Sequence, residues 1–180
     1  MNGTKLAGGP TQDEIMAVAL FKLGLTRTDT VLEIGCGTGK VSVALAKNSE
    51  WVYSVDKRHE AISCAAETAR LAGITNAEFS CTDAREYLRH DRMYDCAFLG
   101  GTTGIDEILP LLAPKVRRTI VINAVMLSTL ERAVRVLSDL GLFHEVVQVQ
   151  ISRSHEIAGS IMFKPIDPVF IITARGAACS

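Results

Sequence analysis

The sequence predicts a doubly wound α/β domain with a mostly parallel, seven-stranded sheet whose last strand is antiparallel. Short runs rich in apolar and β-branched residues alternate with segments whose apolar residues recur at helical spacing. Strands that are apolar on both faces are typical of a parallel sheet covered by helices on each side. The final two strands have no helical crossover between them, so we expect at least one to be antiparallel.

Composition and charge limit the class of protein. The chain has 180 residues, of which 48% are hydrophobic and 22% charged, as in one globular domain. Its 19 Lys and Arg balance 20 Asp and Glu, which argues against a nucleic-acid binder with a broad basic surface. No apolar run is long enough to span a membrane, and the N-terminus lacks the apolar core of a signal peptide. We therefore expect a cytoplasmic single domain over residues 1–180, with a flexible leader at 1–8 and neither nucleic acid nor membrane as a partner.

The first half of the chain contains the clearest alternation. Thr11-Gln12-Asp13-Glu14 has the pattern of a capping box, so a helix is expected from there to Gly24. Further helices are expected around Val41 to Leu45 and from about Glu60 to Ala72, where apolar residues recur at helical spacing. Four strands are expected between these segments: Thr30 to Ile34, Trp51 to Val55, Ala77 to Cys81 and Tyr94 to Leu99.

The second half continues the pattern and then changes. We expect a helix over Ile105 to Leu112, and another that begins at the capping box of Ser128 to Glu131 and ends at Gly141. The expected strands are Thr119 to Ile122, about Glu145 to Ile151, and Val169 to Thr173. The segment between the last two contains Gly159 and Pro165 and is expected to be a loop.

Glycines and acids stand where the first three strands end. The first strand runs into Glu33-Ile34-Gly35-Cys36-Gly37-Thr38-Gly39, and glycines let a backbone turn tightly and approach a ligand. Asp56 ends the second strand, seventeen residues after Gly39, where a carboxylate can bind a ribose diol. Asp83-Ala84 follows the third strand and could lie beside an adenine ring. The plainer alternatives are a tight strand–helix turn for the glycines and a helix cap for Asp83 or Thr11.

The glycine spacing distinguishes two nucleotide ligands. A dinucleotide loop is GxGxxG, and here the third glycine comes one position early. The spacing instead resembles ExGxGxG, the nucleoside loop of class I S-adenosyl-L-methionine-dependent methyltransferases. That resemblance implies S-adenosyl-L-methionine as methyl donor and makes Glu33, Asp56 and Asp83 the three acidic positions of the site.

Other reactive residues have plainer interpretations. No CxxC pair occurs among the five cysteines, which are Cys36, Cys64, Cys81, Cys96 and Cys179. No histidines have metal-site spacing either, so we expect reduced thiols and no protein-bound metal. We expect Lys57-Arg58 and Arg117-Arg118 to be solvated charges and Trp51 to lie in the core.

The loop after the fourth strand separates methyltransferase classes. Enzymes that methylate amide or nucleobase nitrogen usually carry [DN]PP[FY] there, whereas this chain has Gly100-Gly101-Thr102-Thr103-Gly104. The chain also has Gly9-Pro10-Thr11, the GCGTG loop, Asp83-Ala84 and a tail containing Ile151-Ser152-Arg153, Met162-Phe163 and Asp167-Pro168-Val169. Together these features resemble the decarboxylating cobalt-precorrin-6B methyltransferases of cobalamin biosynthesis. These enzymes methylate carbon 15 of a corrin precursor and remove the acetate of ring C.

The family resemblance implies particular site residues. The family's cofactor contacts fall on Thr11, the loop from Gly35 through Cys36, Gly37 and Thr38 to Gly39, Asp56 and Ala84. Similar enzymes are homotetramers that act on a tetrapyrrole. For that substrate we consider Gly100, Gly101, Arg153 and Lys164, since Arg is a natural partner for carboxylates; surface charge is the alternative for Arg153 and Lys164. The sequence assigns no general base, and a methyltransferase of another small molecule or protein carboxylate, or a non-catalytic S-adenosyl-L-methionine-binding module, stays open.

Overall fold

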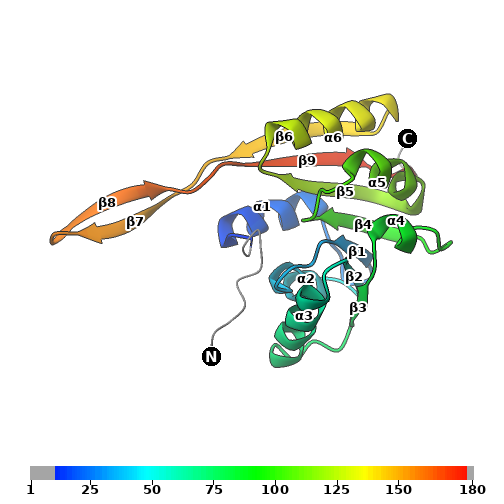
Figure 1. Ribbon diagram of the computed structural model, residues 1–180, viewed down its shortest axis with the longest axis horizontal. Coiled ribbons are helices and arrows are strands. Elements are labelled where there is room, and N and C mark those ends of the chain that lie inside the picture. Colours follow the sequence, from blue (N-terminus) through cyan, green and yellow to red (C-terminus); the bar gives the residue numbers. More distant parts are fainter. Residues whose placement is uncertain (1–10, 178–180) are drawn as a thin grey trace.

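The computed structural model describes residues 11–177, which form an α/β layered structure (Figure 1). The predicted leader at 1–8 and Cys179 lie outside the described residues. The main sheet has seven strands in the order β3-β2-β1-β4-β5-β9-β6. Its strands are β1 (Thr30–Ile34), β2 (Trp51–Asp56), β3 (Ala77–Cys81), β4 (Tyr94–Leu99), β5 (Val116–Ala124), β6 (Phe143–Val149) and β9 (Val169–Arg175). The helices are α1 (Asp13–Leu23), α2 (Lys40–Ala46), α3 (His59–Leu71), α4 (Ala84–Tyr87), α5 (Ile105–Leu112), a 3₁₀ turn η1 (Ala113–Lys115) and α6 (Leu127–Asp139).

Strand directions confirm the predicted sheet. Strands β1 to β5 are parallel to one another, and β9 is antiparallel to both β5 and β6. The strand order reverses between β1 and β4, so this is the topological switch point where α/β sheets bind ligands.

Both faces of the sheet are buried, as the apolar runs predicted. On β1, Val31 packs in the cluster beneath α1 and α2, and Leu32 packs in the cluster beneath α5 and α6. Neither residue is exposed, because successive strand residues point to opposite faces and both faces here are covered by helices.

The helix starts differ from the predicted capping boxes. The N-cap residues are Gln12 and Met126, and neither makes a side-chain capping hydrogen bond. The carboxylate of Glu14 pairs instead with a distant arginine, so both capping-box predictions are wrong. A tertiary contact has replaced the local one at α1.

Arg118, predicted to be a solvated charge, is held by a buried acid. Arg118 donates to both carboxylate oxygens of Asp29, at 3.0 and 2.5 Å, and the Asp29 side chain is only 4% exposed. Burial alone would raise the pKa of Asp29, but hydrogen bonds from Arg118 and Thr26 outweigh it and hold that pKa below its usual value. Arg118 therefore links the turn before β1 to β5.

Trp51, predicted to lie in the core, is only partly buried, with its ring against Tyr53.

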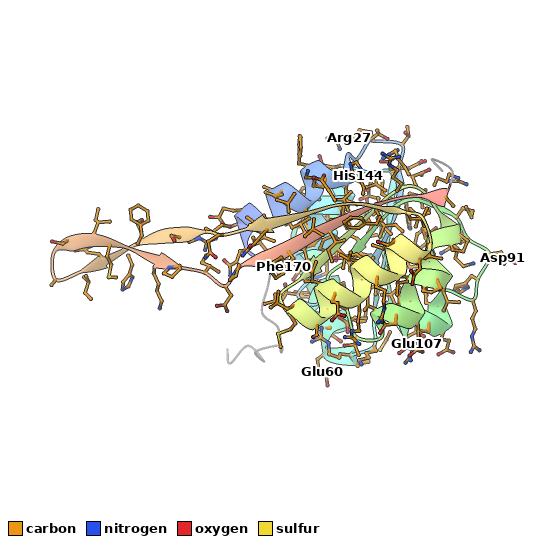
Figure 2. The ribbon with its side chains drawn as sticks, turned by 90° about the horizontal axis from the view of Figure 1, so that it is seen from above. Arg27, Glu60, Asp91, Glu107, His144 and Phe170 are labelled. Carbon is orange, nitrogen blue, oxygen red and sulfur yellow. The ribbon has the colours of Figure 1, made fainter. Side chains whose placement is uncertain are left out.

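The segment predicted as a loop between β6 and β9 is a β-hairpin, here called the arm. Its strands β7 (Ser152–Ile157) and β8 (Ser160–Pro165) are antiparallel and exposed on both faces. Ala158 and Gly159 both have positive φ, +49° and +77°, as in the two-residue turns that suit hairpins. Figures 1 and 2 show the arm projecting away from the body of the molecule. It leaves from the end of β6, which runs parallel to β5, and thus from the carboxyl edge of the sheet.

Candidate active site

Two glycine segments pack backbone to backbone at the switch point. Gly35 has φ +83°, and a Cβ there would lie 2.4 Å from the backbone nitrogen of Gly101. The amides of Gly100 and Gly101 both donate to the carbonyl of Ile34, at 2.9 and 3.0 Å. Any side chain at Gly35 would separate the two segments, so their packing requires a glycine at this position.

A cavity of about 330 Å³ opens at this point, at the carboxyl ends of the parallel strands. That volume lies at the lower end of the range for small-molecule sites. Six of the residues predicted from the sequence line it: Gly35, Asp56, Asp83, Ala84, Gly100 and Gly101. Nine further lining residues were not predicted as site residues: Ile34, Val55, Lys57, Arg58, Thr82, Arg85, Thr103, Gly104 and Ile108.

Asp56 ends β2 with its carboxylate at the cavity wall. It accepts hydrogen bonds from the Gly37 amide at 3.2 Å, the Arg58 amide at 3.0 Å, and the Arg58 guanidinium at 3.0 and 2.9 Å. Burial alone would raise the pKa of Asp56, but these donors outweigh it and hold the pKa below its usual value. The acid is thus ionised at neutral pH, and Arg58, predicted to be a solvated charge, instead pairs with it and lines the cavity.

Asp83 follows β3 in a similar arrangement. Its carboxylate caps α4 by accepting from the Arg85 amide at 2.9 Å, and the Arg85 guanidinium binds both oxygens. The hydrogen bonds from Arg85 lower the pKa of Asp83 to about 2. Arg85 also contacts Glu107 of α5 at 2.8 Å. In both strand ends an arginine stands two residues after the acid, and this repeated spacing is a signal that could have identified Arg58 and Arg85 from the sequence.

Glu33 lies behind the cavity wall and does not line it. The residue is fully buried, and its Oε2 accepts from the hydroxyls of Ser42 at 2.5 Å and Ser54 at 2.6 Å. Burial raises the pKa of Glu33 to about 7, against the opposing effect of these hydrogen bonds. Cys36 is also buried, and its burial, followed by the charges of Glu33 and Asp56, raises the pKa of its thiol, which leaves it unreactive at neutral pH.

The remaining predicted cofactor residues do not line the cavity: Thr11, Cys36, Gly37, Thr38 and Gly39. Lys40, the first residue of α2, donates to the carbonyl of Thr11 at 3.0 Å and pairs with Asp13 at 2.8 Å. These contacts bring the start of α1 next to the glycine loop. Gly39, with φ +79°, lets α2 begin where a Cβ would lie 2.6 Å from Cα of Ala65 in α3.

Arg153 and Lys164 are directly opposite each other across the arm. Residues in such positions share one face of a hairpin, so the two cations lie together. Arg153 pairs with Glu14 at 2.5 Å and thereby joins the arm to the start of α1. Neither cation lines the cavity.

Two other features bear on the class of site. Among residues 11–177, no three His, Cys, Asp or Glu side chains are grouped to hold a metal ion. The described helices include none that is both long and apolar enough to cross a membrane.

The sheet order, with the glycine loop after β1 and an ionised acid at the end of β2, is the arrangement of class I methyltransferases, which use S-adenosyl-L-methionine. Solved structures support that class. Precorrin 8W decarboxylase of Methanobacterium thermoautotrophicum superposes with a TM-score of 0.89 at 29% identity, covering 92% of this chain and 91% of that one. Precorrin-6Y C5,15-methyltransferase of Geobacter metallireducens gives a TM-score of 0.89 at 27% identity, with 96% and 94% covered.

The chain belongs to the precorrin methyltransferase family. The profile of the precorrin methyltransferase domain matches residues 5–175. A protein of Methanosarcina acetivorans named probable cobalt-precorrin-6B C(15)-methyltransferase (decarboxylating) is 42% identical over 178 residues, covering 96% of this chain and 97% of its own length. The family resemblance seen in the sequence is therefore confirmed, and the protein is an S-adenosyl-L-methionine-dependent methyltransferase.

Proposed function

We propose that this enzyme methylates carbon 15 of cobalt-precorrin-6B and removes the acetate of ring C as CO₂, in cobalamin biosynthesis. The observation that carries the proposal is the 42% identity, over nearly the whole of both chains, to a relative whose name states that activity. The cavity at the switch point supports it, because its lining suits one nucleoside-sized ligand.

The residues around the cavity fit S-adenosyl-L-methionine. That ligand supplies an activated methyl group when bound. Asp56 would accept hydrogen bonds from the ribose hydroxyls, since an ionised carboxylate offers about four acceptor positions and can keep part of its contact with Arg58. Asp83 and Ala84 would flank the adenine. The loop from Gly35 to Gly39 and Thr11 would hold the amino-acid end, with Glu33 supporting the loop from behind through Ser42.

The chain's own residues would orient the tetrapyrrole. Gly100 and Gly101 present backbone without side chains, so a flat ring can approach the methyl donor closely. Arg153 and Lys164 would bind peripheral carboxylates of the substrate. Loss of CO₂ breaks the bond between the carboxyl carbon and its methylene; the conjugated ring accepts the electron pair, and a proton then completes the new methyl group. Proximity would supply most of the methyl-transfer rate.

We also propose a homotetramer located in the cytoplasm. The arm presents Ile157, Ile161, Met162 and Phe163 as exposed apolar side chains. An exposed hairpin with unpaired edges is a surface suited to pairing with other copies. The cysteines Cys36, Cys64, Cys81 and Cys96 are free thiols, which persist in the reducing cytoplasm. Light scattering after size-exclusion chromatography tests the assembly; a monomer at micromolar concentration contradicts it.

Mass spectrometry of cobalt-precorrin-6B incubated with the enzyme and S-adenosyl-L-methionine tests the activity. The expected product has gained one methyl group and lost CO₂. Methyl gain without loss of CO₂ would place decarboxylation elsewhere. S-adenosyl-L-methionine binding without any change in the tetrapyrrole would favour another substrate or a non-catalytic module.

Paired variants test the division of the site. Asp56→Ala should weaken S-adenosyl-L-methionine binding by about tenfold or more, because hydrogen bonds to a charged group contribute roughly 1.5–3 kcal/mol. Arg153→Ala should weaken tetrapyrrole binding and leave S-adenosyl-L-methionine affinity unchanged. Isothermal titration calorimetry measures both affinities. Full S-adenosyl-L-methionine affinity in Asp56→Ala would remove Asp56 from the ribose site.

A further inference from the structure

The cavity is too small to enclose both ligands of the proposed reaction. Its volume of about 330 Å³ is at the lower limit for one small molecule. If the nucleoside of the methyl donor occupies it, a tetrapyrrole macrocycle must lie against the surface outside. On the proposed function, that surface is the carboxyl edge of β4 and β5, next to the glycine loop from Gly100 to Gly104.

Three exposed apolar residues lie at that edge. The register pairs Leu99 with Ile122, so the chain leaving β5 after Ala124 runs beside the loop that follows β4. The next three residues, Val125, Met126 and Leu127, are 55%, 66% and 70% exposed. In the described body outside the arm, no other run of three consecutive large hydrophobic residues is this exposed.

The sequence at these three residues lacks a side-chain cap for α6. Met126 is the N-cap residue of α6 and makes no capping hydrogen bond. Ser, Thr, Asp and Asn are strongly preferred at that position because their side chains accept from the free amides of the first turn. An exposed methionine there neither caps the helix nor fills the core. Departures from local rules of this kind are expected at functional sites.

The neighbouring strand continues the apolar surface. Phe170, at the start of β9, pairs with Ala124 and packs partly against the core on the α6 side of the sheet. Figure 2 shows Phe170 between the base of the arm and the start of α6. In the sheet, β5 lies between β4, whose following loop lines the cavity, and β9, which follows the arm. The three residues after β5 therefore lie between the cavity and the arm that bears Arg153 and Lys164.

We propose that Val125, Met126 and Leu127 form a platform that binds the apolar ring system of the tetrapyrrole. The inference rests on the proposed function and names the contact surface for its substrate. A flat apolar ring covers exposed side chains of this kind, and the flexible, polarisable methionine adapts to its contour. The peripheral carboxylates would then extend towards the cations of the arm.

The sharpest test is Met126→Ser, which replaces the platform side chain by a good N-cap residue. The melting temperature should stay unchanged or rise, while the KM for cobalt-precorrin-6B rises severalfold. The double variant Met126→Ser, Leu127→Gln should raise the KM about tenfold, equivalent to about 1.4 kcal/mol. S-adenosyl-L-methionine affinity, measured by calorimetry, should remain within twofold of wild type in both.

The matched control is Leu71→Gln, at the end of α3, where the leucine is 72% exposed and distant in sequence from the platform. It should leave the KM unchanged. A KM unchanged in the double variant, with turnover by the wild type intact, overturns the platform alone. A wild-type enzyme that neither binds nor converts cobalt-precorrin-6B overturns the proposed function and the platform with it.

Discussion

Glu33→Gln isolates the energetic effect of the buried acid behind the cofactor loop. Glu33 is fully buried, and burial raises its pKa to about 7 from an ordinary value of 4.5. In the unfolded chain the carboxyl loses its proton near pH 4.5, whereas in the folded chain it keeps the proton until about pH 7. The folded state therefore binds more protons in this interval, and stability falls as pH rises through it.

The magnitude follows from the difference in pKa. One pKa unit corresponds to about 1.36 kcal/mol, so ionisation of Glu33 costs about 3 kcal/mol of folding free energy above pH 7. Glutamine has nearly the same shape and keeps an oxygen that can accept from Ser42 or Ser54, but it cannot ionise. The stabilising contribution of protonated Glu33 is complete below about pH 4.5 and lost above about pH 7.

Urea unfolding of both proteins at several pH values between 4.5 and 8 measures this effect. The unfolding free energy of Glu33→Gln relative to wild type should increase by about 3 kcal/mol across the range. Titrating groups shared by both proteins cancel in that difference. Glu67→Gln, which removes an exposed acid paired with Arg70, should not reproduce the increase. A difference that is constant with pH would refute a raised pKa for Glu33.

Three further changes test the packing around the site. Gly35→Ala combines a positive φ with a contact to the Gly101 nitrogen and should cost about 3 kcal/mol or more in urea unfolding. Gly37→Ala also has positive φ but meets no atom within 4 Å, so a cost of about 1 kcal/mol is expected; equal costs would contradict the close approach. Arg118→Met leaves the carboxylate of Asp29 buried without its main partner and should cost about 2 kcal/mol by the same measurement, less than a fully buried pair because Arg118 is 38% exposed. No loss of stability would show that Thr26 alone satisfies Asp29.

The sequence by itself determined the strands of the main sheet and the acids at their ends. Strands such as β1 are buried on both faces, and a strand buried on both faces shows in the sequence as a run of consecutive apolar residues. Gly35, Asp56 and Asp83 could be placed at one edge because the carboxyl ends of parallel strands meet there.

Contacts between distant segments could not be predicted in this way. The sequence predicts a loop where the arm lies, because residues exposed on both faces show no alternation of apolar and polar side chains that would mark strands. The predicted capping box at Thr11 is wrong because the Glu14 carboxylate forms an ion pair with Arg153, which is distant in the sequence. The platform at Met126 has no local signature except a missing cap.

Sequence pattern therefore determined which segments form strands and helices, because burial of a face imposes a period on neighbouring residues. Only the tertiary structure decided that Gly35 and Gly101 meet backbone to backbone, that Arg58 binds Asp56 at the cavity, and that Val125, Met126 and Leu127 stay exposed. These depend on how separate segments pack in space, and side-chain partners and exposed surfaces leave no period in the sequence.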